Sequence, residues 1–171
     1  MKKLIYLTII TLLGFLNLKS QNDIHAGEMN FQNTIANDSI LIEISAPTTG
    51  WLAVGFNIEN KIVGSDLKMF KVNNGQIEAE DQFVKGIQDH PGDASIGGEN
   101  NIKLLSGIED AKGTRIKFKI PLHSNDRFDY SHKMKVDFWL ILAYSESDDF
   151  EHHSIMRKHF QINWSEEQGI K

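Results

Sequence analysis

The 171-residue sequence predicts an all-β domain, a two-sheet antiparallel β-sandwich, on three observations. Apolar and polar residues alternate over several short segments, which is the period of a half-buried strand. Turn-forming residues separate those segments at short intervals. No segment of ten or more residues has a clear helical period. Short strands with regular turns and no helices favour two sheets packed face to face.

Residues 1–20 have the pattern of a secretory signal peptide. Two lysines precede an apolar run at residues 4–16, which is too short and too early for a membrane span. We expect cleavage near Ser20 and an exported protein, periplasmic or secreted, with no membrane insertion after cleavage. An uncleaved membrane anchor is the alternative.

Residues 21–171 are expected to form a single domain. The sequence has no cysteine, which excludes cysteine nucleophiles, cysteine-based zinc sites and iron–sulfur clusters. Removal of residues 1–20 takes away three lysines and no acid, so the formal charge changes from −5 to −8. Such an acidic chain without a basic run is not expected to bind nucleic acid or an anionic membrane.

The strands follow from local patterns taken in chain order. Isoleucines at 40, 42 and 44 alternate with Leu41 and Glu43, and residues 115–120 place three apolar side chains on one face and three cations on the other. Residues 136–144 are almost continuously apolar, which is typical of a strand covered on both faces. We expect strands near 28–31, 40–45, 51–57, 66–72, 76–84, 101–105, 115–120, 136–144 and 158–164.

Five short motifs occur in an order that resembles a known family. They are Gly50-Trp51-Leu52-Ala53-Val54-Gly55-Phe56, Val63-Gly64-Ser65-Asp66, the Asn74-Gly75 hairpin with Glu80-Asp81-Gln82-Phe83 after it, the segment 102–107 and the segment 117–122. Together they resemble the DOMON domain, the module related to the N-terminal domain of dopamine β-monooxygenase and to the cytochrome domain of cellobiose dehydrogenase. The resemblance extends over about residues 27–164.

This resemblance implies an immunoglobulin-like DOMON sandwich that binds haem b, with possible electron transfer, or a sugar. It implies no chemistry by the domain itself, and no hydrolase, metalloprotease or phosphate-loop motif occurs, so we do not expect an enzyme. The expected partners are haem, a sugar or a redox partner protein. The competing interpretation is a structural or protein-interaction sandwich with no cofactor.

Haem-binding members of the family use one histidine and one methionine as axial ligands. Their histidine lies in the loop before the last strand, where His153 with Arg157 fits the pattern best and His152 is the second candidate. Their methionine stands two residues before the turn glycine, where this chain has Ile62, which offers iron no lone pair. The resemblance therefore leaves Met69, or no protein group, as the second axial ligand.

Two other sites are predicted from the residues. Asp66 and Asp81 are expected at the open end of one hairpin, with Asp93 in the long loop 86–100, and their hard carboxylate oxygens would suit Ca²⁺. A sugar would stack on exposed rings. Most aromatic residues are expected in the core, which leaves Tyr130 and Trp164 as the rings expected at the surface.

Overall fold

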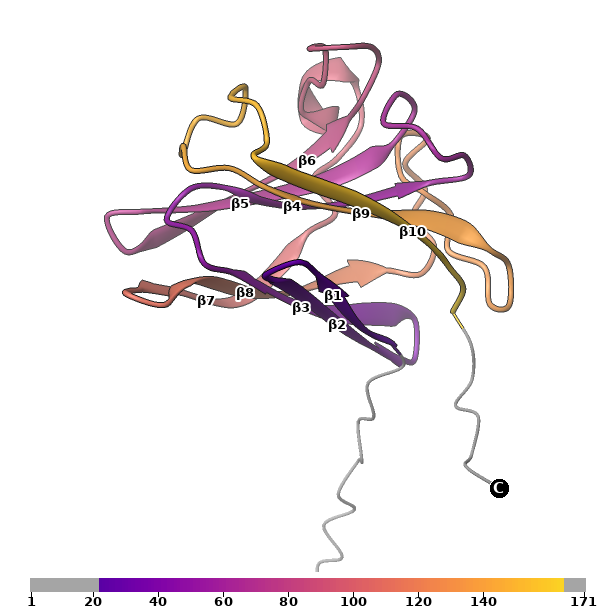
Figure 1. Ribbon diagram of the computed structural model, residues 1–171. Helices are drawn as coiled ribbons and strands as arrows, with labels where there is room; N and C mark the ends of the chain where they lie inside the picture. The colour runs from indigo at the N-terminus through magenta and orange to yellow at the C-terminus, as the bar shows by residue number, and fades with distance from the viewer. Residues whose placement is uncertain (1–21, 165–171) are drawn as a thin grey trace, which may run out of the picture.

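The computed structural model describes residues 22–164, and the predicted signal peptide at 1–20 lies outside the described residues. Two five-stranded antiparallel sheets pack face to face (Figure 1), as the sequence predicts. The first sheet has the order β1-β2-β3-β8-β7 and the second has the order β10-β9-β4-β5-β6. The strands of the first sheet are β1 (Asn22–Ala26), β2 (Met29–Ala36), β3 (Ser39–Ala46), β7 (Lys103–Asp110) and β8 (Gly113–Pro121). Those of the second are β4 (Leu52–Asn57), β5 (Asp66–Asn73), β6 (Gln76–Phe83), β9 (Phe138–Tyr144) and β10 (Met156–Ile162).

Strand β8 shows how the alternation in the sequence becomes burial. Ile116 and Phe118 are fully buried between the sheets, and Ile120 is 2% exposed. The three cations at 115, 117 and 119 face away from the core. The predicted faces of this strand are confirmed.

Three features of the first sheet and its loops were not predicted. Strand β1 pairs with β2 through a turn at Gly27, whose φ of 69° is easily adopted by glycine. Its sequence is rich in polar residues that are rare in strands, and it pairs on one edge only. Strand β7 runs to Asp110 rather than to 105, and the long loop contains a short 3₁₀ helix, η1 (Asp93–Ile96).

The second sheet is covered on both faces. Every residue of β4 is buried, since its inner face packs against the first sheet and its outer face lies under loops. Figure 1 shows these loops, which follow β4, β6 and β9, on the side of the second sheet away from the first. The outer face consequently has its own apolar cluster, here named the outer-face cluster. Its members are Trp51, Ala53, Leu67, Met69, Val84, Ala143 and Phe150, with Ile62 packed against them.

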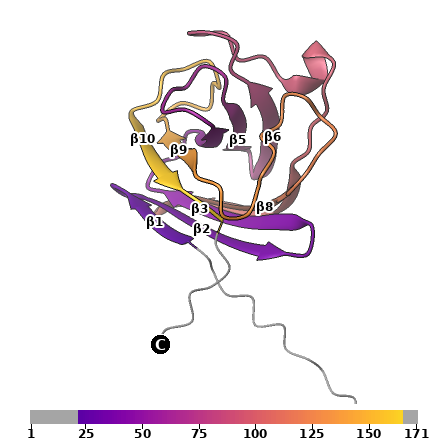
Figure 2. The same ribbon diagram turned by 90° about the vertical axis from the view of Figure 1, so that its right-hand side faces the viewer.

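The segment between β8 and β9 closes one side of the sandwich. Figure 2 shows this orange segment running beside β6. Its backbone is tied to β5, because the Tyr130 N–H donates to Asp66 Oδ2 over 2.9 Å. Within residues 22–164, no helix is long and apolar enough to cross a membrane.

Candidate functional site

The outer-face cluster is assembled from strand residues below and loop residues above. Met69 on β5 is 2% exposed and Trp51, just before β4, is 5% exposed. Phe150 joins them from the loop between β9 and β10, and Ile62 from the loop between β4 and β5. The cluster is therefore an apolar layer held between a rigid sheet and two connecting loops.

Trp51 leaves one polar group unsatisfied in this layer. Its backbone N–H donates to the Ser147 carbonyl over 3.0 Å, and its carbonyl accepts from the Ser145 N–H. The indole Nε1–H is buried and has no acceptor among the described residues. A buried donor without a partner is costly and needs an explanation. A ligand with an acceptor group is one such explanation.

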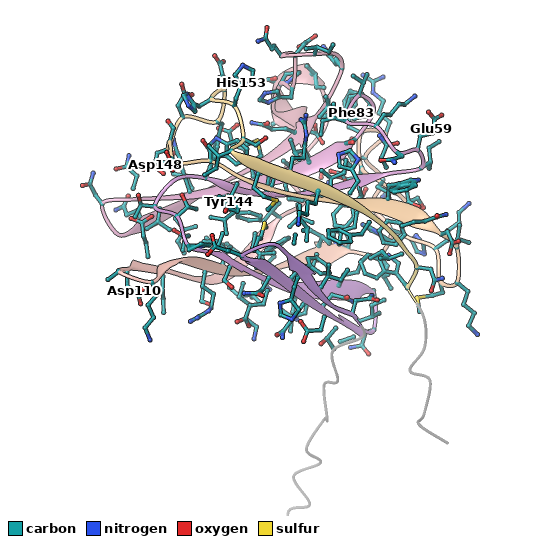
Figure 3. All side chains as sticks on the ribbon, viewed as in Figure 1. Glu59, Phe83, Asp110, Tyr144, Asp148 and His153 are labelled. Atoms are coloured by element: carbon teal, nitrogen blue, oxygen red, sulfur yellow. The ribbon has the colours of Figure 1, made fainter. Side chains whose placement is uncertain are left out.

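The histidines predicted as iron ligands lie above the same face. Figure 3 shows His153 on the loop between β9 and β10, above the second sheet. His153 and His152 are both exposed, and the His153 carbonyl accepts a hydrogen bond from Ser145 Oγ over 3.1 Å. His159 lies on β10 with its Nδ1 2.8 Å from Asn60 Oδ1. The structure therefore brings Met69 and the loop of His152 and His153 to one face.

A buried lysine organises a second site at the end of β5 and β6. Lys68 is 1% exposed. Its Nζ lies 2.6 Å from Asp66 Oδ1 and 2.8 Å from Asp129 Oδ1, and it also pairs with Asp81 Oδ1. One ammonium group thus contacts three carboxylates, here named the Lys68 cluster.

Backbone and amide donors complete the Lys68 cluster. The Asn101 N–H donates to Asp81 Oδ2 over 3.0 Å, and its side-chain amide donates to Asp129 Oδ2 over 2.8 Å. Burial raises the pKa of Asp66 and raises that of Asp81 to about 8, although Lys68 opposes both shifts. The three carboxylates together raise the pKa of Lys68 despite its burial. The ammonium group therefore stays charged. Asp66 and Asp81 keep their protons to a higher pH than ordinary aspartates do, which lowers the negative charge of the cluster.

The metal pair predicted from the sequence lies in this cluster. Asp66 and Asp81 are close in space, and with Asp129 they offer carboxylate oxygens within 4.8 Å of one another. Sequence reasoning missed Lys68, which occupies the space between the carboxylates, and it missed Asp129. The burial of Lys68 could have been predicted from the strand pattern. Lys68 lies two residues before the inward-facing Phe70 in β5 and therefore on the same face of the strand.

Asp93 is a buried carboxylate close in the fold to the Lys68 cluster but without an ion-pair partner in it. It begins η1 and is fully buried. Neither carboxylate oxygen has a hydrogen-bond partner among the described residues. Burial raises the pKa of Asp93 to about 7, with Lys68 opposing the shift and Asp66 adding to it.

The prediction that Trp164 is a surface ring is wrong. Trp164 is fully buried, and its indole N–H donates to His132 Nδ1 over 3.1 Å. Its ring packs 4.6 Å from that of Phe138, centroid to centroid. Burial lowers the pKa of His132 to about 3, so this imidazole is neutral and can accept. Tyr130, the other ring expected at the surface, is half-buried rather than exposed.

The sequence pattern that defines the DOMON domain matches residues 25–145. The chain belongs to the DOMON domain family. The match covers most of the described residues, including Trp51, Met69 and the whole Lys68 cluster. It ends before His152 and His153, so it does not bear on the histidine ligand.

One curated relative is similar to this DOMON domain. It is MOXD1 homolog 2 of Drosophila melanogaster, which is 28% identical over 123 residues. The similarity covers 71% of this chain and 16% of the relative, so the chain spans about a sixth of that protein's length.

Two solved structures share the fold. The cytochrome domain of Myriococcum thermophilum cellobiose dehydrogenase superposes with a TM-score of 0.61 at 10% identity, over 83% of this chain and 80% of that one. The cytochrome b domain of pyranose dehydrogenase from Coprinopsis cinerea gives a TM-score of 0.53 at 9% identity, over 78% and 76% of the two chains. At these identities the likeness shows the DOMON sandwich fold alone.

The outer-face cluster has the chemistry that a haem needs. A porphyrin needs apolar walls, an axial ligand to iron and donors for its carboxylates. The cluster offers apolar side chains, the thioether of Met69 and the unpartnered indole N–H of Trp51. The residues of the cluster therefore fit this group in polarity and in one ligand type, while Ile62 stands where the resemblance leads us to expect methionine.

Proposed function

We propose that this domain is an exported, non-catalytic ligand-binding domain that binds haem b on the outer face of its second sheet. The outer-face cluster is the observation that supports the proposal. It joins a buried thioether, an unpartnered indole N–H and the loop that carries His153 on one side of the sheet. Bound there, haem would give the domain one-electron redox chemistry and hence an electron-transfer role with a partner protein.

In this proposal each residue has a distinct role. Met69 would offer its sulfur from the sheet, and His153 would offer an imidazole nitrogen from the loop, with His152 as its substitute. Trp51 would donate its indole N–H to a carboxylate of the ligand. Phe150 excludes water from the layer, because it is 9% exposed and packs onto the cluster. A thioether and an imidazole suit electron transfer, since both oxidation states keep the same ligands.

A sugar is the second ligand class for the same domain, and a cofactor-free interaction domain is the third interpretation. Neutral sugars are often bound by stacking on an aromatic ring that is open to solvent. Among residues 22–164, every Phe, Trp and Tyr side chain is at least half-buried. The haem proposal therefore has more support from the described side chains than a sugar bound on an aromatic platform.

The test is a haem titration of the mature chain, with affinity measured by absorbance. We expect saturable 1:1 binding that weakens at least tenfold in His153→Ala, while His159→Ala binds like the wild type. Trp51→Phe keeps the ring, removes the donor and should weaken binding severalfold, with Trp139→Phe as the matched control. Ile62→Met restores the residue found in haem-binding relatives and should tighten binding. If neither the wild type nor Ile62→Met takes up haem, the haem proposal is wrong.

We also propose a bound divalent cation, most simply Ca²⁺, at the carboxylates beside η1. Asp93 supports it, because a fully buried carboxylate with no partner needs a positive charge or a proton. Asp66 and Asp81 would share the cation in competition with Lys68. We expect Ca²⁺ to raise the melting temperature of the wild type and of the exposed control Asp89→Asn, but not that of Asp93→Asn. Equal melting temperatures with Ca²⁺ and with a chelator in the wild type would contradict the cation.

A further inference from the structure

Two lysines on neighbouring strands of the first sheet lie directly opposite each other. Lys103 on β7 pairs in register with Lys119 on β8, and both side chains face away from the core. Like charges directly opposite are unfavourable in a sheet. Within residues 22–164, neither lysine has a carboxylate within ion-pair distance. Further along β8, by contrast, Lys117 lies 3.6 Å from Glu43.

Both lysines line one open cleft of about 560 Å³, a volume typical of small-molecule sites. The cleft lies where β8 ends beside the turn between β2 and β3, since Ser39 pairs with Pro121. The turn contributes Asn37 and Asp38 to the lining, and the residues after β8 contribute His123.

The lining dictates a ligand of mixed chemistry. Two ammonium groups attract an anionic group such as a carboxylate, sulfate or phosphate. Asp38 is an acceptor, and among the described residues only its Oδ1 is used, by Ser39 Oγ at 3.0 Å. An acceptor carboxylate favours an anionic ligand that also carries hydroxyl groups over a simple inorganic anion. Asn37 adds an amide, which can donate to a hydroxyl oxygen or accept from a hydroxyl.

We propose that this cleft binds an acidic sugar, a uronic acid or a short oligosaccharide ending in one. Its carboxylate lies between Lys103 and Lys119, and its hydroxyl groups donate to Asp38. The site is on the first sheet, whereas the outer-face cluster is on the far side of the second sheet (Figure 1). The test of this proposal is therefore independent of the test of haem binding.

Calorimetric titration of the mature chain with digalacturonate tests the proposal. We expect saturable binding that weakens as salt rises, because exposed charges are screened. The double variant Lys103→Met/Lys119→Met should bind at least tenfold more weakly. Lys112→Met removes a charge at the far end of the β7–β8 hairpin and should bind like the wild type. Asp38→Asn should weaken digalacturonate binding while leaving the affinity for inorganic phosphate equal or higher.

Four outcomes would overturn the proposal. The first is no binding of digalacturonate by the wild type. The second is equal loss of affinity in Lys112→Met and in the double variant, which would show a general effect of net charge. The third is phosphate, sulfate and acetate binding as tightly as digalacturonate, which would show an anion site with no recognition of hydroxyl groups. The fourth is a neutral digalactoside that binds as tightly as digalacturonate, which would show that the lysines do not recognise the carboxylate.

Discussion

Lys68 and Asp81 face each other across the β5–β6 pairing and form an ion pair sealed from solvent. Asp66 and Asp129 bind the same ammonium group, the latter from the segment between β8 and β9. This one side chain therefore fixes the second sheet to the segment that closes the side of the sandwich.

Substitution of Lys68 should be strongly destabilising. Lys68→Met keeps the length of the side chain but leaves three buried carboxyl groups without the ammonium group that they share. Loss of one partner from a buried ion pair costs about 3–5 kcal/mol. Lys61→Met is the control, since Lys61 pairs with Glu59 over 2.6 Å, both side chains are more than half exposed, and such surface pairs contribute about 1 kcal/mol or less. Chemical denaturation measures both, and equal losses would show that the Lys68 cluster does not hold the closing segment.

The free energy of unfolding should fall as pH rises from about 4 to about 8. Burial raises the pKa of Asp81 to about 8 and that of Asp93 to about 7, from an ordinary value of 3.8. Between these values the folded chain holds protons that the unfolded chain has released. This stabilisation is complete below pH 4 and is lost as pH rises through the raised pKa values. Asp93→Asn should flatten the decline between pH 4 and 7, and Asp89→Asn should not. Stability that rises across this window in the wild type would contradict the assignment.

His132 should contribute the opposite slope between pH 3 and 6.5, where it partly offsets the two aspartates. Burial lowers its pKa from 6.5 to about 3. Between these pH values the unfolded chain binds a proton at His132 and the folded chain does not. The contribution of His132 to stability is therefore complete above pH 6.5 and is lost as pH falls towards 3. His132→Gln retains an acceptor for Trp164 without titrating in this range. Its stability relative to wild type should improve steadily on acidification, and a constant difference would show that His132 does not titrate as proposed.

The faces of β8 predict unequal costs for two neighbouring substitutions. Phe118 is fully buried, with its ring centroid 4.4 Å from that of Phe70 on the other sheet. Phe118→Ala should cost about 3–5 kcal/mol. Lys117→Ala removes a half-exposed side chain and should cost about 0.5 kcal/mol or less. Denaturation of the two variants measures the difference, and equal costs would show that the strand is assigned to the wrong faces.

The parts of the fold that were predictable are those specified by adjacent residues. Asn74 and Gly75 both have positive φ, 52° and 75°, as the Asn-Gly turn of the β5–β6 hairpin requires. That turn sets the register that brings Asp66 and Asp81 to one end. The alternation in β3 and β8 likewise needed no knowledge of distant contacts.

The parts that were missed depend on residues far apart in the chain. The buried position of Lys68 becomes tolerable through Asp129, 61 residues away. Trp164 can be buried because His132, 32 residues away, accepts its N–H. No local pattern specifies either partner. The outer-face cluster was missed for a related reason, since apolar residues on the outer side of β4 and β5 indicate burial but not what covers them.

The visible spectrum of the mature chain after haem addition and reduction tests the central claim most directly. Ligation by His153 and Met69 predicts a six-coordinate, low-spin spectrum with a sharp band in the reduced state. His153→Ala should abolish this spectrum. Met69→Leu preserves the volume of the cluster and should convert the spectrum to a five-coordinate, high-spin form that binds carbon monoxide. A wild-type spectrum identical to that of free haem, before and after reduction, would contradict haem binding at the outer-face cluster.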